Sequence, residues 1–208
     1  MDKIDILYYI NLDYRTDRKA ELLEWLEDSG FPDSKVERIS GVYTPGRGHF
    51  GCLLSHIKTL ETFLASSHNN CLILEDDYTP LDVPTFWSHF EKLFSAEKEF
   101  DVVMCSYNQL KSDETNVPFL RKVHESFTTS GYLITRSFAP KLLKEWKLCV
   151  DLGLKEEEET KKKTHTYMLD VYWSKLMPHS NWFCFYPRIG YQRASYSDLQ
   201  CHYTDHKV

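Results

Sequence analysis

A short apolar run at residues 71–74, Cys-Leu-Ile-Leu, constrains the fold of this chain more than any other segment, because it ends abruptly in three consecutive acids. A continuous apolar run of this length is typical of a strand that is buried on both faces. Strands of that kind occur in sheets that carry helices on both sides. The run therefore predicts a central strand of an α/β sheet, with Glu75, Asp76 and Asp77 at its carboxyl end.

Strand and helix patterns alternate along the first half of the chain, and turn residues separate them. Strands are predicted at residues 4–10, 36–39, 71–74, 101–106 and 131–134. Helices are predicted at residues 20–26, 51–64, 86–94 and 139–148. This order predicts one α/β domain over residues 1–208, with a Rossmann-like, mostly parallel sheet and helices on both faces. The charged segment 155–163 predicts a solvated surface loop, or a flap over the substrate.

Composition and charge disfavour several classes of protein. The formal net charge is -6, from 31 acids and 25 bases, whereas nucleic-acid binders usually carry a basic surplus. No apolar run approaches the roughly 20 residues of a membrane span. No signal peptide or retention signal is recognisable, which predicts a cytoplasmic protein, or one in the host cytoplasm or virion if it is viral. The six cysteines are scattered singly, so most are expected to be small buried hydrophobic residues.

The acids at the end of the central strand are the first candidate site. In an open α/β sheet, ligands collect outside the carboxyl ends of the strands. Three adjacent carboxylates there would repel one another unless a positive group lay between them, and a hard divalent cation with bound phosphates fits that need. Such an ion would also neutralise charge on a departing diphosphate. Glu75 and Asp77 are expected to project to the same side, as ligands for metal and ribose. The alternative is a solvated acidic turn.

Two further segments, one after the first predicted strand and one at the start of a predicted helix, are candidates for binding phosphate or another anion. Arg15 and Arg18 lie just after the first predicted strand, and arginine suits bidentate contacts to phosphate. They could equally pair with neighbouring acids. The segment from Gly51 to His56 is predicted to open a helix, whose free N–H groups can hold an anion. His56 could alternatively be a core residue with satisfied hydrogen bonds.

Taken together, these segments resemble glycosyltransferase family 25, which includes bacterial lipooligosaccharide galactosyltransferases and procollagen galactosyltransferases. The resemblance covers nearly the whole chain and is closest to a compact bacterial or viral form. The matching segments, in order, are Tyr9 to Leu12 with Arg15 and Arg18, Gly51 to His56, Leu74 to Asp77, Ser130 to Arg136, Leu169 to Tyr172, and Pro187 to Asp198.

This resemblance implies a glycosyltransferase-A fold, inversion at the anomeric carbon, a UDP-sugar donor (usually UDP-galactose, with glucose as an alternative) and Mn2+, with Mg2+ as a second choice. The acceptor would be a hydroxyl on a glycan or on a hydroxylysine-type protein site. The resemblance places the metal and the diphosphate at Glu75, Asp76 and Asp77. It places donor recognition around five residues, namely Asn11, Arg15, Arg18, Ser55 and His56.

An inverting transfer needs a base for the acceptor hydroxyl, and a carboxylate is the usual choice. Asp170 is the candidate, between the charged insert and an aromatic segment, although it could instead cap a helix. Asp198 is the second candidate for a catalytic role. His202 is proposed as a metal ligand from elsewhere in the chain, and Gln192 is assigned to the acceptor side.

Two other functions remain open at this point. A catalytically silent relative could bind a nucleotide-sugar or a glycan as an adhesion or scaffold module. A glycosidase would need two carboxyl groups placed across a sugar, roughly 5 Å or more apart, which adjacent acids on one strand end do not favour. The sequence gives no indication of the oligomeric state.

Overall fold

The computed structural model describes residues 1–162, 167–197 and 202–204, with no side-chain description for 195–197 and 202–204. Its centre is an eight-stranded sheet in the order β2-β1-β3-β8-β5-β9-β7-β6. The strands are β1 (Ile6–Asn11), β2 (Val36–Ser40), β3 (Asn70–Glu75), β5 (Val102–Met104), β6 (Asn108–Glu114), β7 (Leu120–Phe127), β8 (Gly131–Thr135) and β9 (Trp182–Phe185). Strands β8 and β7 run opposite to the other six, so the sheet is mixed but mostly parallel in direction.

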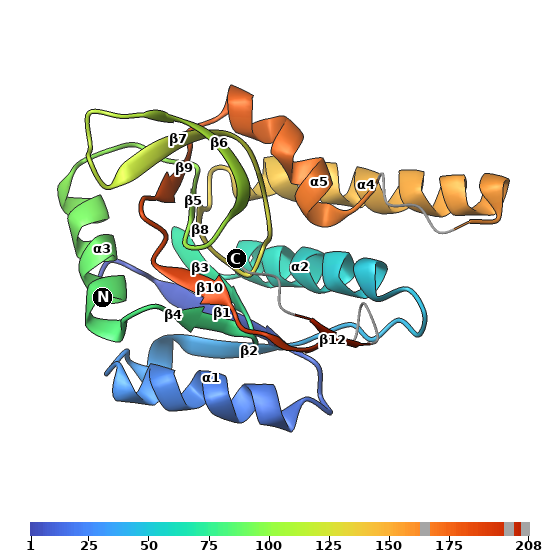
Figure 1. The fold of residues 1–208 in the computed structure, drawn as a ribbon, viewed down its shortest axis with the longest axis horizontal. Coiled ribbons are helices and arrows are strands. Elements are labelled where there is room, and N and C mark those ends of the chain that lie inside the picture. The colour runs from blue at the N-terminus through green and yellow to red at the C-terminus, as the bar shows by residue number, and fades with distance from the viewer. Residues whose placement is uncertain (163–166, 198–201, 205–208) are drawn as a thin grey trace.

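Helices cover both faces of this sheet, which confirms the predicted fold class (Figure 1). Against one face pack α2 (Gly48–Ala65), α4 (Ala139–Thr160), α5 (Leu169–Trp173) and the 3-10 helix η2 (Ser174–His179). Against the other pack α1 (Thr16–Asp28) and α3 (Val83–Ser95). The remaining elements are η1 (Asp33–Lys35), a pair of short strands β4 (Tyr78–Pro80) and β10 (Gly190–Gln192), and a second pair β11 (Ser195–Ser197) and β12 (His202–Thr204).

The central strands have no polar face because each face has its own core. In β3, Cys71 and Ile73 belong to the core under α2 and α4, whereas Leu72 and Leu74 belong to the core under α1 and α3. All four side chains are 0% exposed. Burial on both faces explains why this strand reads as a continuous apolar run, as the sequence predicted.

The structure adds a β-hairpin that the sequence patterns did not predict. Strands β6 and β7 pair antiparallel at the edge of the sheet, with register shifts between Asn108 and Ser112. Strand β6 has the sequence NQLKSDE, in which partly buried and exposed residues alternate. A polar edge strand of this kind buries little apolar area, so it leaves no apolar run in the sequence to find.

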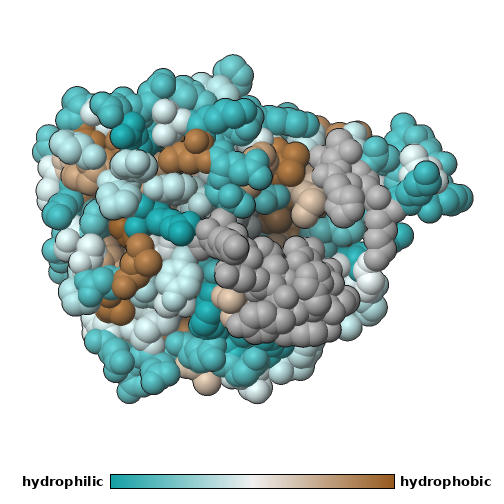
Figure 2. Space-filling view, in the orientation of Figure 1, coloured by the Kyte–Doolittle hydropathy of each residue, from teal (hydrophilic) through white to brown (hydrophobic). Residues whose placement is uncertain are grey.

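Helix α4 corrects the prediction of a charged loop at residues 155–163. The helix continues to Thr160, and residues 155–160 form its last turns. Glu157 faces inward there and is 8% exposed. Figure 2 shows mostly hydrophilic residues over the projecting end of this helix. Among the described helices, α4 included, none has the length and apolar character needed to cross a bilayer.

Cysteine usage agrees with the prediction of single, mostly buried thiols. The described cysteines are all free: Cys52, Cys71, Cys105, Cys149 and Cys184. Four of them are buried, and Cys52 is partly exposed.

Candidate functional site

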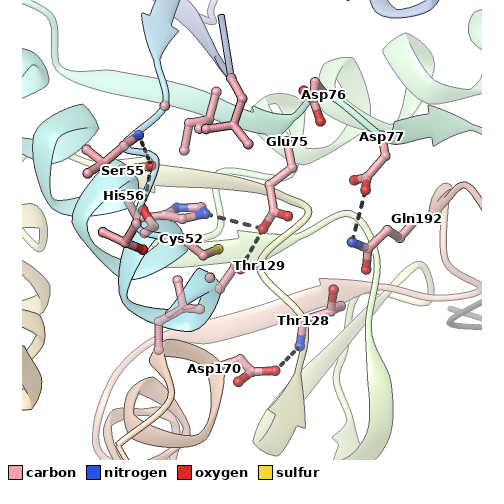
Figure 3. A pocket seen from close by; sticks show the side chains of 18 of the residues that line it. Cys52, Ser55, His56, Glu75, Asp76, Asp77, Thr128, Thr129, Asp170 and Gln192 are labelled. Carbon is pink, nitrogen blue, oxygen red and sulfur yellow. Dashed lines mark hydrogen bonds and ion pairs between the residues drawn. The ribbon is translucent and has the colours of Figure 1, made fainter. Parts of the chain in front are cut away.

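A cavity of about 420 Å³ lies at the carboxyl edge of the parallel strands β1 and β3. Its size suits a small-molecule ligand, since such sites are commonly about 300–1,000 Å³. The candidate polar side chains reach it from six parts of the fold, as Figure 3 shows for most of them. They come from the start of α1, from α2, from the end of β3, from the β7–β8 turn, from α5 and from β10.

Glu75, Asp76 and Asp77, at the end of β3, form one wall of the cavity, which we call the acidic wall. Asp76 and Asp77 share one cation there. Arg18 Nη1 lies 3.0 Å from Asp76 Oδ1 and 2.8 Å from Asp77 Oδ2. The sequence predicted an extended chain that would pair Glu75 with Asp77. Instead the chain turns at Asp76 and Asp77, and the guanidinium bridges these two acids.

Asp77 has an unusually high pKa for an aspartate. Burial, with a further contribution from the charges of Glu75 and Asp76, raises the pKa of Asp77 to about 7, although Arg18 and Gln192 oppose the shift. Asp77 Oδ1 is buried and has no hydrogen-bond partner among the described residues. A buried oxygen without a partner is costly, so this atom is a candidate ligand for a bound cation.

Glu75 is held from two sides. Thr129 Oγ1 donates a 2.7 Å hydrogen bond to Glu75 Oε1, and His56 Nε2 lies 3.3 Å from the same oxygen. Burial alone would raise the pKa of Glu75, but the hydrogen bonds from His56 and Thr129 and the charge of Arg18 hold it below its usual range. Glu75 is therefore ionised at neutral pH. His56, which is 0% exposed, also lies 3.0 Å from the Tyr132 hydroxyl.

Asn11 lies behind Asp76 and is 1% exposed. Its amide donates 2.7 Å and 2.9 Å hydrogen bonds to Asp76 Oδ2 and to the Arg15 carbonyl. Arg38 in turn donates a 3.1 Å hydrogen bond to Asn11 Oδ1. Asn11 therefore supports the acidic wall from behind and is not itself among the residues that line the cavity.

Arg15 reaches the cavity but is held by a neighbouring acid. Its Nε and Nη2 atoms donate hydrogen bonds of 3.0 Å and 2.9 Å to the two carboxylate oxygens of Asp17. These contacts lower the pKa of Asp17 to about 2, chiefly through the hydrogen bond from Arg15. Both predicted roles of Arg15 are therefore compatible with its position, because it pairs with an acid and also lines the cavity.

The start of α2 differs from the prediction. The helix begins at Gly48, and the Gly51 N–H donates to the Arg47 carbonyl at 3.2 Å, so it is not free to bind an anion there. A Cβ on Gly51 would lie 2.5 Å from the Val42 carbonyl oxygen. Glycine therefore allows the loop between β2 and α2, at the rim of the cavity, to pass close to the helix. Ser55 secures this contact, because its hydroxyl accepts a 2.8 Å hydrogen bond from the Val42 N–H.

Asp170 stands on a different wall of the cavity, as Figure 3 shows. Its carboxylate accepts hydrogen bonds from the backbone N–H groups of Thr128 at 3.3 Å and of Val171 at 2.9 Å. Burial raises the pKa of Asp170, and these two N–H groups oppose the rise only in part. Thr128 has a φ of 76°, a strained conformation for a β-branched residue, and strain of this kind clusters at functional sites.

The remaining candidates have mixed outcomes. Gln192 lies on β10, and its amide donates a 3.3 Å hydrogen bond to Asp77 Oδ2, so it borders the acidic wall. The backbone of His202 is in β12, but its side chain lies outside the described part of the chain. Asp198 also lies outside the described residues.

The cavity also contains residues that were not identified as candidates from the sequence, among them Cys52, Thr128 and Thr129. The four-residue spacing of Cys52 and His56 was a usable signal, because it places both side chains on one face of a helix. The two threonines left no local signal, since they lie in the turn after β7, a strand that was not predicted.

The family model "Glycosyltransferase family 25 (LPS biosynthesis protein)" matches residues 43–154. A solved structure described as mannose-1-phosphate geranyltransferase from Thermus thermophilus superimposes with a TM-score of 0.50 at 10% identity. That match covers 90% of this chain and 75% of the other, and it shows a shared fold alone.

Two curated relatives carry the same family name, "Glycosyltransferase 25 family member". The protein from Anopheles gambiae is 27% identical over 177 residues, and the protein from Aedes aegypti is 26% identical over 177 residues. Each match covers 69% of this chain but only 30% and 29% of the respective relative. The family model matches more than half of this chain, and the acids at the end of β3 line the cavity described above. On these grounds the chain belongs to glycosyltransferase family 25.

Proposed function

We propose that this chain transfers a hexose, galactose or glucose, from a UDP-sugar to a hydroxyl of a glycan or hydroxylysine-type acceptor, with inversion at the anomeric carbon. The observation that carries the proposal is the gathering of Glu75, Asp76 and Asp77 with Arg18 in one cavity at the carboxyl ends of parallel strands. Ligands of open α/β sheets bind at this edge. Carboxylates beside an arginine suit a ligand that brings both a cation and phosphates.

The acidic wall fits a hard divalent cation, Mn2+ or alternatively Mg2+. Asp77 offers the buried Oδ1 atom that has no partner among the described residues, and Glu75 is ionised. Oxygen ligands of this type are what such ions prefer. When bound, the ion supplies Lewis-acid neutralisation of the charge on the departing diphosphate. His202 stays a proposed further ligand.

Arg18 is the residue that we assign to the diphosphate. It is the cation nearest to Asp76 and Asp77, and its side chain is 12% exposed at the cavity. A planar guanidinium can contact two phosphate oxygens at once. Arg15 and Ser55 also line the cavity, where contacts with Asp17 and with the Val42 N–H fix their side chains. They would thus shape the donor site with little reorganisation.

Asp170 is our candidate base for the acceptor hydroxyl. Burial makes it more basic than an ordinary aspartate, and the N–H groups of Thr128 and Val171 fix its direction. A base that is oriented before the acceptor arrives can remove the proton as the new glycosidic bond forms. Gln192 is assigned to the acceptor side, beside Asp77, and Asp198 remains the alternative catalytic carboxylate.

A donor screen tests this function directly. UDP release would be measured with a panel of UDP-sugars, Mn2+ and a panel of glycan and hydroxylysine acceptors. We expect one UDP-hexose to give acceptor-dependent release that Asp170→Asn reduces and Asp151→Asn, an exposed control on α4, does not. Tight UDP binding without any turnover would instead indicate a catalytically silent binding module.

A further inference from the structure

Cys52, His56 and Glu75 form a compact cluster that the proposed transfer reaction does not use as a unit. Cys52 and His56 are four residues apart on α2 and therefore lie on the same face of the helix. Glu75 comes to them from the end of β3, as Figure 3 shows. One thiol sulfur, one imidazole nitrogen and one carboxylate oxygen lie within 4.8 Å of one another.

The geometry is close to that of a bound transition-metal ion. In a tetrahedral zinc site, bond lengths of about 2.0–2.3 Å place neighbouring ligand atoms roughly 3.3–3.6 Å apart. His56 Nε2 and Glu75 Oε1 are already 3.3 Å apart. The Cys52 sulfur lies within 4.8 Å of both atoms, so it must move closer to them to complete the set.

The outer contacts of the cluster suit metal ligands as well. His56 Nδ1 lies 3.0 Å from the Tyr132 hydroxyl, and Thr129 donates to Glu75. A metal-bound histidine normally has its second ring nitrogen in a hydrogen bond, which fixes the tautomer and the orientation of the ring. The Tyr132 hydroxyl oxygen can accept the proton of Nδ1 when Nε2 binds an ion. Both ligands are therefore oriented before any metal arrives.

The donor set differs in chemical type from the wall around Asp77. A thiolate with an imidazole and a carboxylate favours zinc-like cations, whereas Mn2+ and Mg2+ favour oxygen ligands. All three residues line the cavity, so a fourth coordination position would open into it. Binding would exchange the Cys52 thiol proton, released to solvent, for a sulfur–metal bond. The two anionic ligands would then balance the double charge of the ion.

We propose that Cys52, His56 and Glu75 bind a zinc-like divalent cation, and that its occupation inhibits the enzyme. Inhibition follows because the ion takes Glu75 from the acidic wall and fills part of the space for the donor. The inhibitory consequence rests on the proposed transferase function. The binding site itself does not.

Binding is tested with Co2+ as a spectroscopic substitute for Zn2+, on the full chain and without nucleotide. The parent protein should give a thiolate-to-cobalt charge-transfer band in the near ultraviolet that one equivalent of Zn2+ removes. Cys52→Ser should lose the band. Its Zn2+ affinity should fall by at least roughly 10–100-fold, because losing even a residue that only hydrogen-bonds to a metal ligand typically costs that much. Glu75→Gln should weaken binding while keeping the thiolate band at high Co2+.

Cys149→Ser is the matched control, because Cys149 is a free thiol on helix α4 that hydrogen-bonds the Tyr167 carbonyl. It should leave the band unchanged, and circular dichroism should show that every variant is folded. Survival of the band in Cys52→Ser, or the absence of any band in the folded parent, would overturn the proposal.

Inhibition is tested by titrating Zn2+ into the UDP-release assay at fixed Mn2+, with each variant compared to its own zinc-free rate. The parent should be inhibited at Zn2+ concentrations at least roughly 10-fold lower than Cys52→Ser requires. Equal zinc sensitivity of the two proteins would refute inhibition through this site. A cobalt–thiolate band without any transferase activity would leave the metal site standing and refute the proposed function.

Discussion

The two walls of the cavity hold their carboxylates by different means. On the acidic wall, which lies at the end of β3 and is called the β3 wall from here on, Asp76 and Asp77 contact the guanidinium of Arg18, which comes from α1. On the α5 wall, Asp170 is held by two backbone N–H groups. The guanidinium on the β3 wall can also contact phosphate, whereas on the α5 wall burial raises the pKa of Asp170 and the two N–H groups oppose the rise only in part. We therefore propose separable roles, donor binding on the β3 wall and proton transfer on the α5 wall.

Asp170→Asn should produce the largest effect and should spare the β3 wall. The variant keeps the shape of the side chain but removes the proton acceptor, so turnover should fall by roughly 10²–10⁴-fold, the usual worth of a positioned base. UDP affinity should stay within a few-fold of the parent. Steady-state kinetics with calorimetric UDP titration checks both values.

Two outcomes would break the assignment of Asp170. Near-normal turnover would make it a structural carboxylate that holds the Thr128 backbone and would move the search for the base to Asp198 or Glu75. A large loss of thermal stability together with the loss of activity would show an indirect effect.

Asp77→Asn should change the pH dependence of stability. Burial raises the pKa of Asp77 from 3.8 to about 7, so in this interval the folded state binds a proton that the unfolded chain releases. The stability of the metal-free parent should therefore fall as pH rises from about 4 to about 7. The variant lacks this titration and should be more stable above about pH 7 by roughly 1–4 kcal/mol, because one pKa unit corresponds to about 1.4 kcal/mol.

Urea unfolding in chelator between pH 4 and pH 8 measures this difference, with Asp151→Asn as the exposed control. The stabilities of parent and Asp77→Asn should converge near pH 4. Parallel pH profiles would show that Asp77 is ionised in the folded protein without metal.

Asn11→Ala should weaken the β3 wall from behind. The variant removes the 2.7 Å hydrogen bond to Asp76 and the 2.9 Å bond to the Arg15 carbonyl. Leaving buried groups without partners typically costs about 1–3 kcal/mol, so unfolding stability should fall by that amount. UDP affinity should fall as well, while exposed Asn116→Ala should change neither quantity. Unchanged stability would show that water replaces the amide.

Glu157→Gln should give the smallest effect. Glu157 Oε2 lies 3.2 Å from Arg47 Nη2, and Oε1 lies 3.5 Å from His49 Nε2, so the acid joins α4 to the rim of the cavity. Arg47 is 51% exposed, and an ion pair with an exposed partner contributes about 1 kcal/mol or less. Thermal melting should show a correspondingly small decrease, with exposed Glu158→Gln as the control. A loss of UDP binding would instead place this helix end in the donor site.

The sequence predicted strands β1 and β3, where burial dictates residue type, but it missed β9, which is apolar and buried as well. Strands β1 and β3 are apolar because helices cover both of their faces, and that pattern also located Glu75, Asp76 and Asp77. Strand β6 could not be found because it lies at the sheet edge and is polar. The end of α4 was mistaken for a loop because its charges suggested solvation, although Glu157 faces the rim.

The contacts between residues of the site were harder to predict than the identity of the residues that form it. Arg18 was expected near phosphate, but its bridge between Asp76 and Asp77 depends on a turn after β3 that the residue types do not specify. The contact of Thr128 with Asp170 joins residues 42 positions apart through a strained backbone conformation. Contacts of this kind arise from tertiary packing, which local patterns do not encode.

The division of roles between the two walls is tested most directly by titrating UDP calorimetrically into the parent, Asp77→Ala and Asp170→Asn, each with Mn2+ and with chelator. The account predicts that Mn2+ strengthens UDP binding to the parent and to Asp170→Asn, by roughly the 5–150-fold that coupled ligands commonly show. The affinity of Asp77→Ala should be the same in both conditions. Equal UDP affinity of the parent with Mn2+ and with chelator would contradict the assignment of a metal to the β3 wall.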